Sequence, residues 1–416
     1  MRMRGMIVCA FGLLLLVAAL SDNAFTQQGN PNPFANREGE ALADPFKGVT
    51  TDGKVVPGLF SIRSTGVSTE PVRKATEAFL ASLDESGRQK TRFSVEDVEW
   101  RRWNNVHRYV RQGISFLEMN DAQRESAFAL LKASLSAKGF KQTRDIMRLN
   151  GALAELTGKP GEYGEWLYSI TVMGDPSATK PWGWQLDGHH LVINYFVLGD
   201  QVVMTPAFMG SEPIKVDSGK FAGTSVMESE EKKGAALMAS LSEDQKRKAV
   251  IETSKTGNNA LAQAFQDNLV LDYAGIPGAE LSDTQKKMLL EVIAAYVGNM
   301  DDGHARVTMD EISKHLDKTY FAWIGDTKPE SVFYYRVQSP VVLIEFDHQN
   351  PVALPGPRVP GRLHVHSLIR TPNGNDYGKD LLKQHYQQSH GLRPLPAQGS
   401  ESRELAQADA LSVPAR

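Results

Sequence analysis

The stretch WGWQLDGHHLVINYFV, residues 182–197, decides the fold of this chain. Two runs rich in aromatic and β-branched residues flank the dipeptide Asp187-Gly188, which is the strongest short signal for a hairpin turn. A second turn at Gly199-Asp200 leads into a third run, residues 201–208. The pattern predicts an antiparallel meander of three strands.

The same order of strands returns near the C-terminus. Residues 332–337 and 341–347 flank a turn at 338–340, and residues 362–369 form a third strand. In place of the tight second turn, a loop from His348 to Gly361 contains four prolines. A long loop at one of two equivalent points is often where function was added.

Helical sequence precedes each meander, and parts of it repeat. FLASLDE (79–85) matches LMASLSE (237–243), and Gly113-Ile114 before DAQ (121–123) matches Gly275-Ile276 before DTQ (283–285). The alternative is that such short segments are common at helix starts, where an N-cap residue is followed by an acidic residue in the first turn. We expect an α+β protein with two similar halves, each a helical segment followed by an antiparallel β-meander, from an internal duplication. Whether the two meanders join into one sheet stays open. Helices are expected at 71–86, 120–137, 143–157, 229–256, 258–273, 281–298, 308–318 and 379–389.

The N-terminus predicts export to the periplasm or the medium. Residues 1–26 combine a basic start, an apolar run from Ile7 to Leu20 and small residues at a cleavage point, as in a signal peptide. The alternative is an uncleaved anchor, but the run is shorter than the roughly 20 residues that span a bilayer. Cys9, the only cysteine, lies inside this signal, so cysteine nucleophiles, thiolate metal sites and disulfides are excluded from the mature chain.

The remaining chain divides into four parts. Residues 27–58 read as a flexible tether, 59–228 as the first half, 229–390 as the second half with a histidine-rich end, and 391–416 as a flexible tail. The net charge of −3 argues against nucleic acid as a partner. No later segment has the length of an integral membrane segment after signal cleavage.

Histidines carry the most specific chemical signal, since the motifs of α/β-hydrolases, zincins, P-loops and dinucleotide folds are absent from the sequence. His364 and His366 lie two apart on a strand, so their rings share a face and can hold one metal ion. His190 is the best third ligand, and His189, His348 and His385 are possible further members. We expect one divalent transition metal, with Zn, Fe and Cu not distinguished. The alternative is that each histidine is an ordinary hydrogen-bonded residue.

Two carboxylates are candidate catalytic residues. Glu345 shares a strand face with Asp347 and could act as a general base, a metal ligand or the partner of a ligand histidine. Its alternative role is a salt bridge with Arg336 or Arg370. Asp376 is the second candidate acid or base, or else a helix cap.

Three larger side chains are candidates for binding a small-molecule or sugar-like ligand. Trp184 belongs to an aromatic strand that could offer a flat platform, and Arg336 and Arg370 could hold an anionic group. The alternative is that such aromatic residues belong to the core of the sheet.

The chain also resembles a known family. Trp182-Gly-Trp, His189-His190, Glu345-Phe-Asp347, His364-Val-His366 and the string NDYG (375–378) look like the bacterial and fungal proteins catalogued as domain of unknown function 3500. The resemblance covers residues 60–390 or nearly so. It implies that the histidines and acids form one site, and it implies no particular reaction.

These observations together predict an exported, metal-dependent enzyme. Hydrolysis is slightly preferred over oxidation, since a metal held by imidazoles supports both and no redox cofactor motif occurs. The alternatives are a non-catalytic, extracytoplasmic ligand-binding protein and a structural envelope protein.

Overall fold

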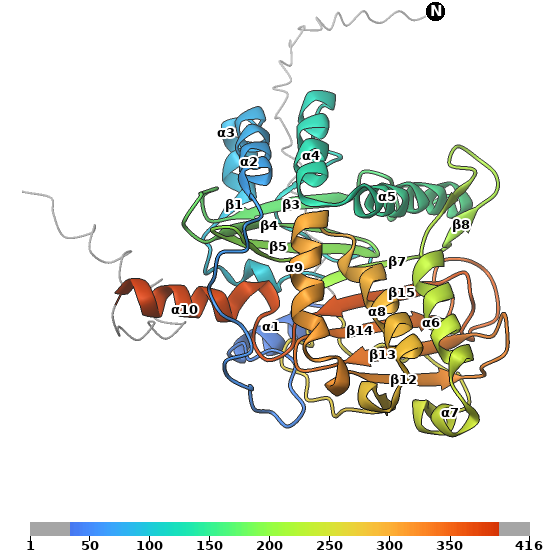
Figure 1. The fold of residues 1–416 in the computed structure, drawn as a ribbon. Helices are drawn as coiled ribbons and strands as arrows, with labels where there is room; N and C mark the ends of the chain where they lie inside the picture. Colours follow the sequence, from blue (N-terminus) through green and yellow to red (C-terminus); the bar gives the residue numbers. More distant parts are fainter. Residues whose placement is uncertain (1–33, 391–416) are drawn as a thin grey trace, which may run out of the picture.

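The computed structural model describes residues 34–390 of the chain (Figure 1). The predicted signal sequence and the predicted tail, residues 391–416, lie outside the described residues. Residues 34–58 belong to the predicted tether, yet they include helix α1 (Ala35–Ala43) and bury Val49 completely. The backbone of Thr50 bonds with Leu269 and Leu271, so this part of the tether packs on the core. No helix in the described range is long and apolar enough to cross a membrane.

One mixed, 13-stranded sheet runs through the molecule and joins both halves. Its main path, in spatial order, is β1 (Arg92–Phe93), β3 (Tyr168–Met173), β4 (Trp182–Gly188), β5 (Leu191–Leu198), β7 (Ala207–Ser211), β15 (Val365–Arg370), β14 (Leu343–His348), β13 (Phe333–Gln338), β12 (Tyr320–Gly325) and β10 (Val250–Glu252). Three short strands pair beside this path: β2 (Ile114–Ser115), β6 (Gln201–Val203) and β11 (Ile276–Pro277). A separate hairpin consists of β8 (Lys215–Val216) and β9 (Thr224–Ser225).

The two halves meet at the antiparallel pair β7–β15. On either side of this pair the strands follow the same order along the chain, from β1 to β7 and from β10 to β15, and each half ends in a parallel edge strand. The mixed α/β architecture and the two meanders are therefore as predicted, and the open question of the joined sheet is settled. Each half also contributes three strands to the sheet that we did not predict: β1, β2 and β3 in the first half and β10, β11 and β12 in the second.

One turn and one strand of the first meander differ from prediction, whereas the turn at Gly199-Asp200 is as predicted. The hairpin turn lies at His189-His190 and not at Asp187-Gly188, which pair within the sheet. Gly188 is needed for packing, since a Cβ there would lie 2.0 Å from the ring of Tyr168. The predicted third strand is broken into β6 and β7 around Pro206, which has no N–H to continue the ladder.

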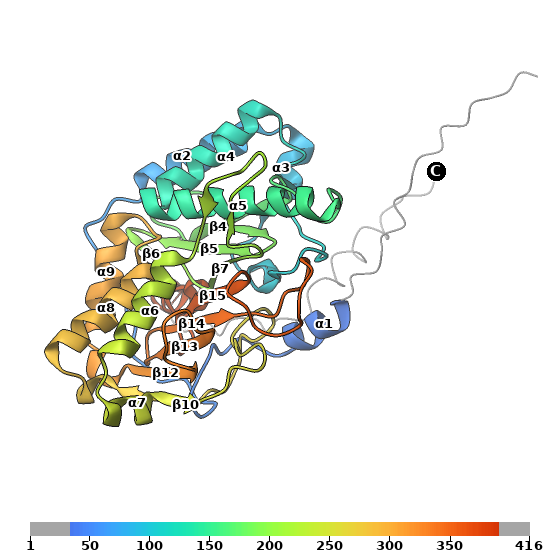
Figure 2. The ribbon, with the colours of Figure 1, turned by 90° about the vertical axis from the view of Figure 1, so that its right-hand side faces the viewer.

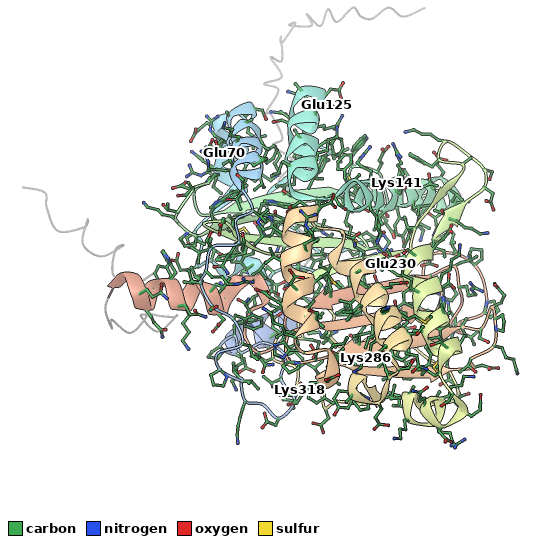
Figure 3. All side chains as sticks on the ribbon, viewed as in Figure 1. Glu70, Glu125, Lys141, Glu230, Lys286 and Lys318 are labelled. Atoms are coloured by element: carbon green, nitrogen blue, oxygen red, sulfur yellow. The ribbon has the colours of Figure 1, made fainter. Side chains whose placement is uncertain are left out.

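Helices cover one face of the sheet, as Figures 1 and 2 show. This layer contains α2 (Glu70–Ser82), α4 (Asp121–Ser134), α5 (Ala137–Thr157), α6 (Glu228–Ser240), α8 (Asp283–Val297) and α9 (Asp302–Ser313), with the short α3 (Glu85–Thr91) and α7 (Glu243–Ala249) beside it. The repeated segments DAQ and DTQ do lie at helix starts. Asn120 and Gln123 form a capping box at the start of α4, and Ser282 and Gln285 form one at the start of α8. The main hydrophobic core lies between these helices and the sheet. Charged side chains such as Glu125 on α4 and Lys286 on α8 project from the layer (Figure 3).

The opposite face of the sheet is covered by loops, by α10 (Lys379–His390) and by the 3-10 turns η1 (Val98–Arg101) and η4 (Asp376–Gly378), around a smaller second core. Two further 3-10 turns, η2 (Gly278–Glu280) and η3 (Leu316–Lys318), lie near α8 and α9. The helix predicted over 258–273 is wrong, because this segment has no helix and runs as an irregular strap. We call residues 258–267 the strap. Its N–H groups bond to carboxylates of the sheet, as described below, so they do not close helical turns.

Candidate metal centre

Three buried imidazoles converge at the junction of the two halves. His190 lies in the β4–β5 turn, His366 lies on β15 and His364 precedes β15 by one residue. Their Nε2 atoms are 3.0 to 3.1 Å apart in all three pairs. The side chains are 3 to 8% exposed. This group, which we call the triad, is the one set of His, Cys, Asp or Glu side chains in the described part of the chain whose spacing suits a metal ion.

The backbone explains why the rings can meet. Gly210 on β7 pairs with His366, and its N–H donates to the carbonyl of His190 at 2.8 Å. A Cβ at Gly210 would lie 2.3 Å from the carbonyl oxygen of Val365, so any side chain would force β7 and β15 apart. His190 adopts a φ of 60°, which lets the tight turn aim its ring at β15.

Two of the three rings have a fixed orientation. The Nδ1 of His364 lies 2.7 Å from the carbonyl oxygen of Asn350, and the Nδ1 of His366 lies 3.0 Å from Oε1 of Gln263. A carbonyl oxygen only accepts, so each Nδ1 carries the proton and each Nε2 is left with a bare lone pair. Two bare nitrogens 3.0 Å apart repel each other unless a cation lies between them.

The spacing fits a transition metal. Zinc binds imidazole nitrogen at about 2.0–2.1 Å, which places two nitrogens of a tetrahedral site about 3.3 Å apart. The observed separations are 3.0 to 3.1 Å, so a small outward movement of each ring would admit the ion. Three buried histidines could therefore hold a metal ion.

Burial also sets the charge state of the rings. Desolvation holds the pKa of His190 and of His366 well below the usual range, and the neighbouring imidazoles lower them further. Burial likewise lowers the pKa of His364, although Glu212 opposes this shift. Neutral imidazole is the form that binds metals, so the site is ready for a cation at neutral pH.

The buried carboxylate of Glu212 lies next to the Nδ1 side of the His364 ring. Oε2 of Glu212 lies 3.7 Å from Nδ1 of His364, and the same carboxylate accepts from the backbone N–H groups of Val352, Ala353 and Leu354 at 2.9 to 3.1 Å. These three residues belong to the proline-containing loop between β14 and β15. That loop, predicted as a place of added function, thus contacts the triad through Asn350 and Glu212.

The three further histidines of the prediction differ in position. His189 stacks on the ring of His190 at 3.9 Å and bonds to Asn150 through Nδ1, so it is a neighbour of the triad. His348 accepts from the N–H of Phe333 and contacts Glu231, on the helix-covered face opposite the triad. His385 lies half-buried on α10 beside Tyr386. The structure does not bring His348 to the triad.

Glu345 holds the strap. Its carboxylate accepts from the N–H groups of Leu261 and Ala262 at 2.8 to 3.1 Å and from the hydroxyl of Tyr334 at 2.6 Å. Burial raises the pKa of Glu345, and these three partners oppose the rise. Asp347 accepts from the two preceding N–H groups of the strap, those of Asn259 and Ala260, at 2.6 and 2.9 Å. The catalytic role of Glu345 stays a prediction, since all these contacts are structural.

Asp376 and Arg370 belong to a buried ion-pair network. Arg370 contacts Asp267 and Asp376 at 3.0 Å each and donates to the strap carbonyls of Ala262 and Gln263. Asp376 also accepts from the N–H of Thr371, so it closes a turn and does not cap α10. Burial raises the pKa of Asp376 to about 6, against the influence of Arg370. Neither side chain touches the triad in the described structure.

The remaining predicted ligand-binding residues are also buried. Trp184 is 0% exposed and stacks on Tyr195 in the main core, on the opposite face of the sheet from the triad. It therefore offers no open platform. Arg336 is 4% exposed and donates to the carbonyl of Asp272, beside the register partner Glu345. Substrate binding by Trp184, Arg336 or Arg370 stays a prediction without a contact to support it.

Sequence reasoning missed three residues that support the triad: Gln263, Asn350 and Glu212. The contact of Gln263 with His366 was not predicted because residues 258–273 were expected to form a helix. Asn350 acts through its carbonyl oxygen, which any residue type would supply. Glu212 has a detectable signal, since a charged residue directly follows the apolar strand AFMGS and precedes a proline.

The comparison with known proteins gives a family and no activity. The family model described as "Protein of unknown function (DUF3500)" matches residues 65–379, which include the triad and all its supporting residues. No curated protein and no solved structure matches the chain. Because the match spans most of the sequence and both halves of the sheet, the chain belongs to the DUF3500 family.

Proposed function

We propose that this protein is an exported metal-dependent enzyme, with hydrolysis of a small-molecule substrate as its reaction. The observation that carries the proposal is the triad, in which three Nε2 atoms lie within 3.1 Å of one another. Two of them are left bare by the bonds that fix the opposite ring nitrogens. A divalent cation would satisfy the bare nitrogens of such an arrangement.

Three imidazoles favour a catalytic over a structural metal. Structural zinc sites use four protein ligands, whereas catalytic zinc sites use three and leave a position for water or substrate. A metal held in this way lowers the pKa of bound water and supplies a nucleophile near neutral pH. The same imidazoles also suit Fe, Cu and Ni, so hydrolysis is preferred here on the ligand count and on the missing redox signatures of the sequence.

Metal content tests the centre. The purified protein, stripped with chelator and reloaded in turn with Zn²⁺, Fe²⁺ and Cu²⁺, should retain about one ion per chain by elemental analysis. His364→Ala should lose that ion. His315→Ala is the matched control, since it removes a half-buried imidazole near α9 and should retain the ion. A wild-type protein that retains none of the three metals would overturn the proposal.

Turnover tests the reaction. The loaded protein is assayed on chromogenic carboxylic, phosphate and glycosyl esters, and we expect hydrolysis of one class that follows metal content across the variants. Metal retention without any hydrolysis, together with saturable binding of a small molecule, would support the non-catalytic ligand-binding alternative. Metal-dependent oxygen uptake would support an oxidoreductase.

Export is part of the same proposal and rests on the sequence of residues 1–26. The full-length chain produced in a bacterium with an outer membrane should appear in the periplasm or the medium. Its intact mass should lack those residues. A full-length mass in the membrane fraction would instead indicate an uncleaved anchor.

We also propose that the two halves arose by internal duplication. The support is the repeated order of strands on both sides of β7–β15 and the repeated helix starts. Superposition of residues 92–211 on 250–370 should match strands and helices in one continuous order. A match that requires reordered elements would count against a duplication.

A further inference from the structure

Glu212 is the buried carboxylate that contacts the triad, and unlike Asp347 and Asp187 it has no lysine or arginine partner in the described structure. It is 2% exposed, and its only ion-pair partner among the described residues is His364, at 3.7 Å. Asp347 pairs with Lys255 at 2.8 Å, and Asp187 pairs with Arg111 at 3.1 Å. Glu212 thus has no lysine or arginine to balance its charge.

A divalent metal in the triad creates the opposite imbalance. Three neutral imidazoles add no charge, so the ion would leave two positive charges in a place where the ligands are 3 to 8% exposed. Such a buried charge is costly unless an anion lies nearby. Glu212 lies behind His364, and at 3.7 Å its contact is electrostatic, because the Nδ1 proton already goes to Asn350.

We propose that Glu212 is the counter-charge of the metal centre and that it couples the centre to the loop of residues 350–354. The inference rests on the proposed metal-dependent function. Asp347 is the other carboxylate at hand, as the register partner of His366, but Lys255 already neutralises it. Glu212 is a positioning residue, since it acts on the metal through His364.

The coupling follows from shared contacts. The carboxylate of Glu212 holds the N–H groups of Val352, Ala353 and Leu354, while the carbonyl of Asn350 holds the ring of His364. The start of the loop is therefore fixed to the same ring that would bind the ion. A metal bound by His364 would therefore further restrain the loop through these contacts.

Zinc affinity tests the charge role. Competition with a chromogenic chelator should give Glu212→Gln a Kd for Zn²⁺ about 10- to 100-fold weaker than wild type, the usual range for lost partners of ligand histidines. Glu212→Asp keeps the charge and should recover most of the affinity. Asp200→Asn is the matched control, because Asp200 also holds a loop through backbone N–H groups, those of Thr65 and Gly66. It should bind Zn²⁺ as wild type does.

The outcomes separate the two proposals. Unchanged affinity in Glu212→Gln, or equal weakening in the Gln and Asp variants, would overturn the charge role while leaving the metal centre intact. A wild-type protein that binds no metal would overturn the proposed function, and this inference with it.

The loop can be followed in the wild-type protein alone, which covers the case of a misfolded variant. Trypsin should cut after the exposed Arg358 more slowly once Zn²⁺ is added, whereas cleavage after Lys220 in the β8–β9 hairpin should not change. Equal rates at Arg358 with and without zinc would refute the coupling.

Discussion

A single buried carboxyl group should give this protein a strong dependence of stability on pH. Glu99 lies in η1, is 2% exposed, and its Oε2 atom has no hydrogen-bond partner in the described structure. Burial, assisted by the nearby Asp187, raises the pKa of Glu99 from its ordinary value of 4.5 to about 8. The folded state therefore keeps a proton that the unfolded chain releases.

The sign and the size follow from proton linkage. Between pH 4.5 and 8 the folded state binds more protons than the unfolded state, so the free energy of unfolding falls as the pH rises. Each pH unit in this window costs about 1.4 kcal/mol, and the whole window costs about 5 kcal/mol at most. Below pH 4.5 the effect vanishes, and above pH 8 it is constant.

Glu99→Gln removes the titrating group and should abolish this contribution to the pH dependence. The free energy of unfolding, measured by urea denaturation at pH 5, 6.5 and 8, should rise in the variant relative to wild type by about 3–4 kcal/mol from the first pH to the last. If the amide also changes the free energy of unfolding by an amount that does not depend on pH, all three values shift equally and the trend with pH is unaffected. Glu125→Gln, on the outer surface of α4 (Figure 3), should show no such trend. A constant difference between Glu99→Gln and wild type at all three pH values would refute the reasoning.

Two further predictions concern the strap and its network. Arg370→Met should destabilise the protein by about 3–5 kcal/mol in urea denaturation, because Asp376 and Asp267 would lose a buried cation, and a loss below 1 kcal/mol would contradict the network's role. In the metal-free protein, ¹⁵N chemical shifts should show the Nδ1–H form of His366, and Gln263→Ala should abolish that preference. An unchanged tautomer in the variant would mean that Gln263 does not orient the ring.

The sheet was partly predictable, for reasons that differ between strands. The stretch 182–197 places two runs rich in aromatic and β-branched residues around Asp187-Gly188, so β4 and β5 follow from it directly. β3, YSITVM, alternates apolar and polar residues over its first five positions, so its own sequence also carries a strand signal, which our prediction left unused. The turn was misplaced because Gly188 serves close packing against Tyr168, a contact across strands that local sequence does not reveal.

The triad was predictable because residues two apart on a strand share a face, which can be read from the local sequence. The residues that support the triad were not predictable in this way. His364 and His366 lie two residues apart, and this rule placed them together without any knowledge of the fold. Gln263 reaches His366 only because Glu345 and Asp347 bind the strap and keep it from forming a helix. The predicted catalytic carboxylate is thus an anchor for a neighbour of the site, a role that depends on residues 84 positions apart.

The place of the triad explains why the chain should have one such centre and not two. The β4–β5 turn of the first half contains His189-His190. The corresponding β13–β14 connection contains Ser339-Pro340 and no imidazole that could bind a metal. His366 lies on β15 at the junction and His364 directly precedes that strand, and both meet His190 because β7 lies between β5 and β15 with Gly210 at the contact. If the halves arose from one ancestor, neither half alone could have formed this site. The metal-binding arrangement would then have required the fused, two-part sheet, and divergence of one half's turn would have left a single asymmetric centre in a nearly symmetric frame.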